Sequence, residues 1–166
     1  MFSAGILTVS DKGSRGERID ESGKVIKGIL AALDAHVVKY EIVPDEREII
    51  SARLVEWVDR EGIDLILTTG GTGLTPRDVT PEATLAIIDK EVPGFAEAMR
   101  AESLKKTPMA VLSRAVSGIR KRSLIINLPG SPKAVRECLE VISPAFSHAI
   151  ETLRGQSGDC ADKSHK

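Results

Sequence analysis

A glycine-rich turn followed by a charged pair is the stretch of this sequence with the clearest potential for chemistry. It lies in LILTTGGTGLTPRDVTPE, where a short apolar run stops at Gly70 and glycine recurs up to Gly73. Successive backbone N–H groups in such a turn can form a nest for an anion, and glycine lets the ligand approach because it has no Cβ. Arg77 and Asp78 then add one cation and one carboxylate. The stretch indicates a site for a phosphate or a pterin-like anion, with a plain tight turn as the alternative.

Two familiar phosphate-binding motifs do not fit these glycines. A Walker P-loop needs a lysine after its last glycine, and no lysine follows Gly73. The dinucleotide fingerprint G-x-G-x-x-G fails as well, because Pro76 stands where the third glycine should be. The residue types therefore indicate an anion site without identifying the anion.

The elements around the turn would place it at one edge of a sheet. The apolar run before the turn, residues 64–69, is typical of a strand buried on both faces. Thr80 can cap a helix and Pro81 suits the first helical position, so we expect a helix to begin just beyond the turn. In open α/β sheets, ligands bind at the carboxyl ends of the strands, which is where the glycine turn would lie.

Two further strands are expected to end in polar residues at the same edge. The apolar run 4–9 stops at Ser10 and Asp11. The apolar run 124–128 stops at Pro-Gly-Ser-Pro, in which Ser131 can cap the next helix. Because the carboxyl ends of parallel strands meet at one edge, these polar residues can reach the glycine turn.

Two other helix starts carry residues of ambiguous role. Ser22 can cap a helix whose apolar residues follow the 3.6-residue period, after a long polar loop over residues 14–23. Asp45 and Glu48 have the spacing of a capping box, although Asp replaces the usual Ser or Thr. Asp45 also lies just after residues 36–43, which we expect to form a strand, and catalytic residues collect at the carboxyl ends of such strands. One carboxylate can serve both purposes.

The alternation of strands and helices predicts an α/β protein, a three-layer α/β/α sandwich with a mostly parallel sheet. A tight turn near Lys121 would make one strand antiparallel. We expect a single domain over residues 1–154. Residues 155–166 are polar and rich in small residues, which predicts a frayed tail.

The composition excludes several classes of protein. The formal net charge is −1 with mixed signs and the aromatic content is 3%, so neither a nucleic-acid arm nor a base-stacking platform is indicated. No apolar run is long enough to cross a membrane, and the N-terminus does not have the pattern of a signal peptide. Cys138 and Cys160 form neither a C-x-x-C pair nor a zinc spacing, which favours a reducing cytoplasm.

The order and spacing of five motifs closely resemble the molybdopterin adenylyltransferase family, the MogA/MoaB-like group that includes domains of plant Cnx proteins and gephyrin. The motifs are TTGGTG (68–73), TPRDVTPEAT (75–84), PGFAEAMR (93–100), LSRAVSGIR (112–120) and INLPGSP (126–132). The resemblance runs from about Ile6 to Leu153. The block from Thr68 to Thr84 carries most of its specificity.

The resemblance implies an ATP- and Mg²⁺-dependent reaction on molybdopterin, a pterin dithiolene with a terminal phosphate. The molybdopterin phosphate would attack the α-phosphate of ATP, giving adenylylated molybdopterin and pyrophosphate. The nucleophile is already an anion, so such catalysis is mostly positioning and charge neutralisation. Asp45 and Asp78 match the family's two essential carboxylates and would hold Mg²⁺ directly or through metal-bound water.

The remaining site residues are carried over by their match to the family motifs. The nucleotide end of the pocket is expected at Ser10, Asp11, Ser22 and Gly23, and the pterin side at Ser113, Arg114, Asn127, Pro129, Gly130 and Ser131. The glycine turn and the helix start after it complete the set with Gly70, Gly71, Thr72, Gly73, Arg77, Thr80, Pro81 and Glu82. The resemblance also implies a homotrimer and a downstream molybdate-insertion protein as partner.

Structural roles stay open beside these functional ones. Arg77 can simply pair with Asp78 or with a surface acid. Asn127 can be a core polar group satisfied by the backbone, and Ser131 caps a helix in either case. Cys138 is expected in the core. The alternative function is that of a family member that binds molybdopterin without adenylylating it.

Overall fold

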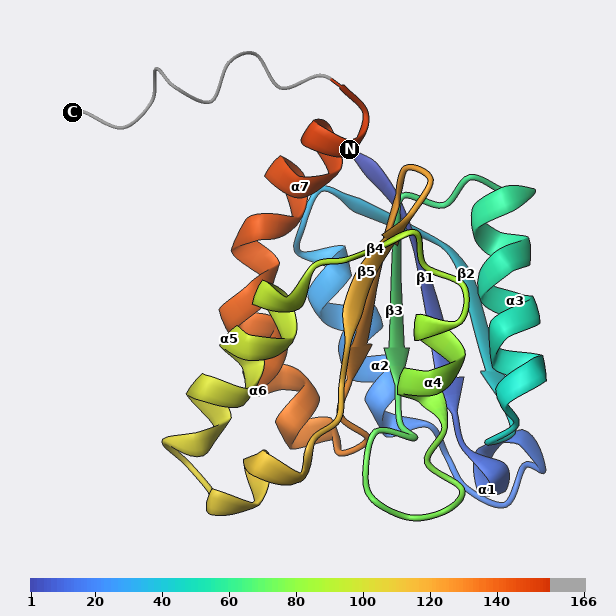
Figure 1. Ribbon diagram of the computed structural model, residues 1–166, viewed down its shortest axis with the longest axis vertical. Helices are drawn as coiled ribbons and strands as arrows, with labels where there is room; N and C mark the ends of the chain where they lie inside the picture. The colour runs from blue at the N-terminus through green and yellow to red at the C-terminus, as the bar shows by residue number, and fades with distance from the viewer. Residues whose placement is uncertain (156–166) are drawn as a thin grey trace.

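Six strands form one sheet in the computed structural model, which describes residues 1–155 (Figure 1). They are β1 (Phe2–Val9), β2 (Ala35–Val43), β3 (Leu65–Thr69), β4 (Lys90–Glu91), β5 (Ser117–Arg120) and β6 (Ser123–Leu128), in the order β2-β1-β3-β6-β5-β4. The strands β2, β1, β3 and β6 are parallel, and β5 is antiparallel to both of its neighbours. The predicted α/β/α fold with one antiparallel strand is confirmed.

Helices cover both faces of this sheet (Figure 1). They are α1 (Asp11–Ser14), α2 (Glu21–Ala31), α3 (Arg47–Asp59), α4 (Thr80–Leu85), α5 (Pro93–Leu104), α6 (Pro132–Ile142) and α7 (Phe146–Leu153), with the 3-10 turns η1 (Pro108–Leu112) and η2 (Ser143–Ala145). Buried residues of α2, α5, α6 and α7 pack on one face, and those of α3 and α4 on the other. Among the helices of residues 1–155, none combines the length and the apolar composition that spanning a bilayer requires.

The central strand β3 is covered on both faces, which explains why apolar and polar residues do not alternate in its sequence. Leu65 and Leu67 belong to the core on one face, while Ile66 belongs to the core on the other. All five residues of the strand are buried. A strand covered on both faces leaves no position for a solvated side chain, so its pattern reads as a continuous apolar run.

On the α3 face, Trp57 lies directly against β1 because position 5 has no side chain. Trp57 is fully buried, and a Cβ built on Gly5 would stand 2.8 Å from its Cε3 atom. That separation is shorter than carbon atoms tolerate without displacement. Gly5 therefore admits the largest side chain of this core.

Near the start of β1, an ion pair ties the last helix to the sheet. Arg154, just after α7, donates to Asp64 through Nε (3.1 Å) and Nη2 (2.8 Å), and through Nη1 to the carbonyl of Met1 (3.3 Å). Burial alone would raise the pKa of Asp64, but hydrogen bonds from Arg154 and Ser3 outweigh it and leave that pKa lowered. The first strand and the last helix are thus fixed to each other.

Three of the four predicted helix caps are shifted, each by a competing hydrogen bond. The α4 cap position is Val79, because the Thr80 hydroxyl donates to the Gly70 carbonyl instead. Asp20 rather than Ser22 caps α2, and Asp45 does not cap α3, whose cap position is Glu46. Ser131 caps α6 as predicted, accepting from Ala134 N.

The segments that the sequence leaves open also have defined structures. Lys121 turns the chain between β5 and β6 with a φ of 53°, as the predicted tight turn requires. Residues 109–116 are occupied by η1 and the extended chain after it. Cys138 is buried as expected. The predicted tail from residue 156 onward, with Cys160, lies outside the described residues.

The contact between Gly5 and Trp57 gives a stability prediction. Gly5→Ala should lower the free energy of unfolding by about 1–3 kcal/mol, since the added methyl group forces the indole ring to move. Urea unfolding followed by tryptophan fluorescence measures both the loss and the altered ring environment.

Gly28→Ala is the matched control. A Cβ at this position of α2 meets no atom within 4 Å. Alanine also favours helix by up to about 1 kcal/mol over glycine, so this variant should be at least as stable as the natural protein. Equal stability of the two variants would contradict the packing argument.

Candidate functional site

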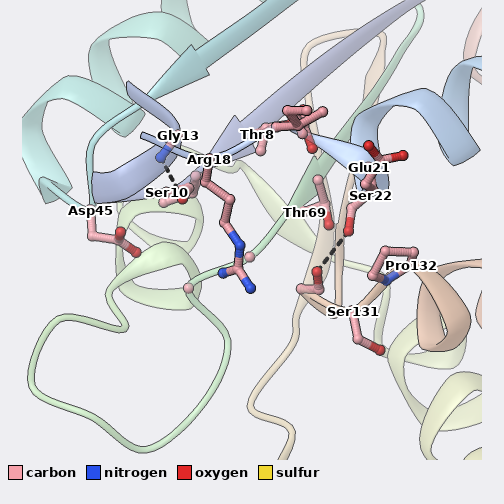
Figure 2. A pocket seen from close by; sticks show the side chains of 16 residues that line it. Thr8, Ser10, Gly13, Arg18, Glu21, Ser22, Asp45, Thr69, Ser131 and Pro132 are labelled. Carbon is pink, nitrogen blue, oxygen red and sulfur yellow. Dashed lines mark hydrogen bonds between the residues drawn. The ribbon is translucent and has the colours of Figure 1, made fainter. Parts of the chain in front are cut away.

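A cavity of about 500 Å³ opens at the carboxyl ends of the central strands (Figure 2). It lies between β1 and β3, where the chain order of the sheet reverses: β2 follows β1 on one side, whereas β3 and the later strands lie on the other. Such a switch point is the usual ligand crevice of an open α/β sheet. The lining residues are Thr8, Val9, Ser10, Gly13, Arg18, Ile19, Asp20, Glu21, Ser22, Asp45, Thr69, Gly70, Gly71, Gly130, Ser131 and Pro132.

The glycine turn after β3 forms part of the floor of this cavity, and two of its positions exclude any side chain. Gly70 has a φ of 94°, and a Cβ there would lie 2.3 Å from the Val9 carbonyl oxygen. Gly71 has a φ of 67°, and its Cβ would lie 2.3 Å from the Thr80 hydroxyl oxygen. Both positions therefore need glycine for backbone conformation and for space.

Part of the predicted anion nest is available. The Gly70 N–H is already used, because it donates to the Leu128 carbonyl at 3.3 Å. Within residues 1–155, the N–H groups of Gly71, Thr72 and Gly73 donate to no protein acceptor. These N–H groups can serve an anion, and Gly71 lines the cavity itself.

Arg114 holds the segment that follows the glycines. Its Nε donates to the Gly73 carbonyl and its Nη2 to the Asp78 carbonyl, both at 2.7 Å. Its Nη1 also pairs with Glu82 on α4. One guanidinium thus ties both ends of the loop 73–78 to the first turn of the next helix. Arg114 is a structural brace here and is not a lining residue of the cavity.

Asp11 and Asp45 link the ends of β1 and β2 by two reciprocal hydrogen bonds. The Asp11 N–H donates to Asp45 Oδ2 at 2.8 Å, and the Asp45 N–H donates to Asp11 Oδ1 at 3.0 Å. Arg77 joins the pair, donating to both carboxylate oxygens of Asp11 and to Glu46. Arg77 therefore pairs with acids other than its neighbour Asp78, and it holds the pKa of Asp11 below the usual value.

Asp45 and Asp78 each keep one carboxylate oxygen available. Asp45 Oδ2 accepts from Asp11 N, and Asp78 Oδ2 accepts from Thr75 N at 2.8 Å. Within residues 1–155, the Oδ1 atoms of both aspartates accept no hydrogen bond. Partial burial raises the pKa of Asp45, and the charges of Asp11 and Asp78 raise it further against the Asp11 N–H bond.

This donor set fits Mg²⁺. Mg²⁺ is usually bound by one or two carboxylates, with substrate phosphates and water completing its octahedron. The free oxygens of Asp45 and Asp78 beside a glycine turn match that description. No group of three or more His, Cys, Asp or Glu side chains suited to a metal occurs in residues 1–155.

On the other side of the cavity, Asp20 anchors the loop that leads into α2. It caps the helix by accepting from Gly23 N (2.9 Å) and also accepts from the hydroxyls of Thr8 and Tyr40. Burial and the Asp20 carboxylate raise the pKa of the Tyr40 phenol. Gly23 has no room for a side chain, since a Cβ would lie 2.3 Å from the Asp20 carboxylate. Asp20 therefore holds the loop against β1 and β2.

Most of the site residues predicted from the sequence either line the cavity or lie in the segments around it. The cavity itself is lined by Ser10, Ser22, Asp45, Gly70, Gly71, Gly130 and Ser131. The Ser22 hydroxyl donates to the Gly130 carbonyl at 2.7 Å, joining two walls (Figure 2). Asp11, Gly23, Thr72, Gly73, Arg77, Asp78, Thr80, Pro81, Glu82 and Arg114 surround it in the loops and helix starts.

Three residues assigned to the pterin side lie elsewhere. Ser113 and Pro129 line a second cavity of about 210 Å³ between α5, η1 and α6. Asn127 is fully buried; its amide donates to the hydroxyls of Thr68 and Thr84, and its carbonyl accepts from Val116 N. Asn127 thus has the core role that the sequence left open.

Several lining residues were not predicted. Thr8 and Thr69 are paired partners near the ends of β1 and β3, so parallel pairing of the predicted strands could have identified them. Asp20 has the signature of a helix cap three residues before Gly23. Arg18, in the long polar loop, carries no motif that distinguishes it from other surface arginines.

Comparison with known proteins places the chain in a family. Residues 5–148 match the family model described as "Probable molybdopterin binding domain". The chain is 48% identical over 153 residues to the molybdopterin adenylyltransferase of Helicobacter pylori strain J99, covering 91% of this chain and 87% of that protein. The chain belongs to the molybdopterin adenylyltransferase family. The resemblance found in the motifs is thereby confirmed.

Two further members of this family show its range. The molybdopterin biosynthesis enzyme MoaB from Thermus thermophilus has 58% sequence identity to this chain. Its crystal structure superposes with a TM-score of 0.89, and the match covers 93% of this chain and 98% of that one. Gephyrin of Dictyostelium discoideum is 43% identical over 172 residues, which span 98% of this chain and 24% of that protein. The family thus includes longer proteins that contain this domain as one part.

The Arg114 brace gives a prediction about the glycine loop. In Arg114→Met, the amides of Thr75 and Asp78, which hydrogen-bond within the loop, should exchange hydrogen about 10-fold faster or more. Hydrogen bonds from a charged donor contribute about 1.5–3 kcal/mol, and their loss favours local opening. Hydrogen–deuterium exchange of peptides covering residues 72–79 measures the effect.

Arg120→Met supplies the control for this experiment. Arg120 makes comparable bonds to Asp59 and to the Ile87 carbonyl, away from the glycine loop. Its loss should leave exchange in residues 72–79 unchanged. If the two variants opened the loop equally, the brace assigned to Arg114 would be wrong.

Proposed function

We propose that this protein transfers the adenylyl group of ATP to molybdopterin in the biosynthesis of molybdenum cofactor. A phosphate oxygen of molybdopterin attacks the α-phosphorus of ATP and forms the new P–O bond. The bond between the α-phosphorus and its bridging oxygen to the β-phosphate breaks, and pyrophosphate leaves with the electron pair. No protonated nucleophile has to be activated, so the protein's task is to bring anions together and stabilise the charge between them.

The observation that carries this proposal is the pair of aspartates on either side of unused backbone donors. Asp45 and Asp78 each keep a free oxygen, and the N–H groups of Gly71, Thr72 and Gly73 are unused within residues 1–155. A polyphosphate needs N–H donors and a cation at once. The site offers the donors directly and the carboxylates as holders of the cation.

Mg²⁺ would be held by Asp45 and Asp78, directly or through water, and would supply charge neutralisation to the phosphates. The reciprocal bonds between Asp11 and Asp45 fix the Asp45 carboxylate in place, so it needs no reorganisation when the substrate arrives. The hydrogen bond from Thr75 N does the same for Asp78. Neither aspartate acts as a general base in this scheme.

The remaining lining residues divide between the two substrates. Ser10 and Ser22 would face the nucleotide, with Asp11 and Gly23 beside them in the adjoining loop and helix start. Gly130 and Ser131, at the start of α6, would contact molybdopterin. The cavity of about 500 Å³ is of the size of a small-molecule site, and extended substrates would continue into its open mouth.

The alternative function is a carrier that binds molybdopterin without transferring an adenylyl group. This alternative stays open, because the 58% identity to the Thermus thermophilus molybdopterin biosynthesis enzyme MoaB does not decide between the two functions. The presence of both aspartates and of the complete glycine turn favours the enzyme. The same pocket would serve either function, and only turnover separates them.

Assembly and compartment stay predictions. We propose a homotrimer in the cytoplasm that passes adenylylated molybdopterin to a molybdate-insertion protein. Sedimentation of the purified protein measures its assembly, and a monomer mass would remove the trimer.

The deciding experiment is a turnover assay with purified protein, molybdopterin, ATP and Mg²⁺. Adenylylated molybdopterin and pyrophosphate should form in near-equal amounts, and chelation of Mg²⁺ should stop both. Binding of molybdopterin without any product would establish the carrier instead.

Asp78→Asn tests the assigned carboxylate, because it keeps the shape and removes the charge. It should retain molybdopterin binding and lose adenylyl transfer by about 100-fold or more, the usual size of a lost electrostatic contact to a transition state. Asp59→Asn is the control, since Asp59 pairs with Arg120 and Lys121 away from the cavity. Unchanged turnover in Asp78→Asn would remove Asp78 from the mechanism.

The pH dependence of the reaction should reflect Asp45. Its pKa is raised, so on acidification it takes up a proton at a higher pH than an ordinary aspartate does. The value of kcat/KM for ATP should therefore fall below a pH that lies above the usual aspartate range, with activity retained toward neutral pH. A profile from about pH 4 to pH 8 measures this with Mg²⁺ kept below the ATP concentration, because a cation bound to Asp45 would itself lower that pKa. An unchanged profile in Asp45→Asn would exclude a required Asp45 carboxylate.

A further inference from the structure

Among the side chains of residues 1–155 that line the cavity at the strand ends, Arg18 is the sole cation. The other charged lining residues are Asp20, Glu21 and Asp45, and no lysine of this part of the chain lines the cavity. Three carboxylates against one guanidinium make this lining unfavourable for a polyphosphate unless cations are added. A metal ion would offset part of that charge, and Arg18 is what the chain itself contributes.

The neighbouring arginines are already committed to acids. Arg77 donates to Asp11 and Glu46, and Arg15 donates to Glu17. Within residues 1–155, Arg18 forms no hydrogen bond and no ion pair. A guanidinium without a partner has nothing to give up when an anion arrives, whereas the paired arginines would have to exchange one carboxylate for another.

The side chain of Arg18 is directed into the cavity. Figure 2 shows it extending from the loop before α2 into the space between Asp45 on one wall and Ser131 on the other. The loop is held two residues further along, where Asp20 accepts from Thr8, Tyr40 and Gly23 N. Arg18 is therefore exposed, while the backbone of its loop is held two residues away at Asp20.

We propose that Arg18 binds a substrate phosphate in this cavity through its guanidinium N–H groups. The assignment rests on the proposed function, because both substrates of adenylyl transfer bring phosphate to the site. Arginine suits the task, since its planar fork can donate two parallel N–H bonds to phosphate oxygens and it stays charged at all working pH values. The phosphate belongs to ATP or to molybdopterin, and separate titrations identify which.

Binding without turnover tests the proposal directly. The α,β-methylene analogue of ATP, which cannot release its adenylyl group, is titrated with Mg²⁺ into the protein by calorimetry, and molybdopterin is titrated separately. Arg18→Gln should weaken one of these ligands by about 10- to 100-fold, as expected for losing charged hydrogen bonds to a phosphate. The ligand that weakens is the one whose phosphate Arg18 holds.

Two further variants keep the test specific. Arg15→Gln removes a cation from the same loop that is paired with Glu17, and it should bind both ligands within about 2-fold of the natural protein. Arg18→Lys keeps the charge without the fork and should recover part of the lost affinity. Thermal unfolding of Arg18→Gln should be unchanged, because this side chain has no partner in residues 1–155.

The outcomes separate this assignment from the proposed function. If the natural protein binds both ligands and Arg18→Gln binds them equally well, the role of Arg18 is wrong and adenylyl transfer stands. Full affinity in Arg18→Lys would also overturn it, because a charge without the guanidinium fork would then suffice. If the natural protein binds neither ligand, the proposed function fails together with the inference.

Discussion

The absence of side-chain space at Gly70 and Gly71 is the constraint on which the rest of the site depends. The turn passes so close to the Val9 carbonyl and the Thr80 hydroxyl that a Cβ at either glycine would overlap them. This closeness lets the Thr80 hydroxyl reach the Gly70 carbonyl and sets where α4 begins. It also brings the end of β3 against the end of β1, so that residues of both strands line one cavity.

The charged groups around that turn fall into two sets, those that pair with other protein groups and those that stay available to a ligand. Arg77 and Arg114 bind acids and carbonyls of the loops, and so they stabilise the scaffold. Asp11 holds Asp45 through the backbone and leaves an oxygen of that carboxylate free. The groups left for a ligand are few and already oriented, which lowers the reorganisation that a reaction between anions would need. Burial of Asp45 is the cost of this order, because it disfavours the charged form.

Sequence reasoning succeeded where local pattern decides structure. The buried strands, the antiparallel β5, the Ser131 cap and the position of the glycine turn all follow from apolar runs and turn residues. It failed where a tertiary bond competes with a local one, as at Thr80, whose hydroxyl serves Gly70 instead of its own helix. Arg18 could not be predicted as a lining residue, because its position depends on how the loop before it folds.

The ion pair between Arg154 and Asp64 places both described ends of the chain beside the amino end of the sheet. The cavity is lined by residues at the carboxyl ends of β1 and β3, and Figure 1 shows these strand ends pointing away from the N-terminus. A polypeptide joined before Met1 or after α7 would therefore leave from the side remote from the ligands. The domain is thus geometrically suited to covalent fusion, and the chain is similar to about a quarter of the longer gephyrin of Dictyostelium discoideum. Because both described ends lie away from the cavity, a domain of this kind can be joined to other domains without obstructing its ligand site.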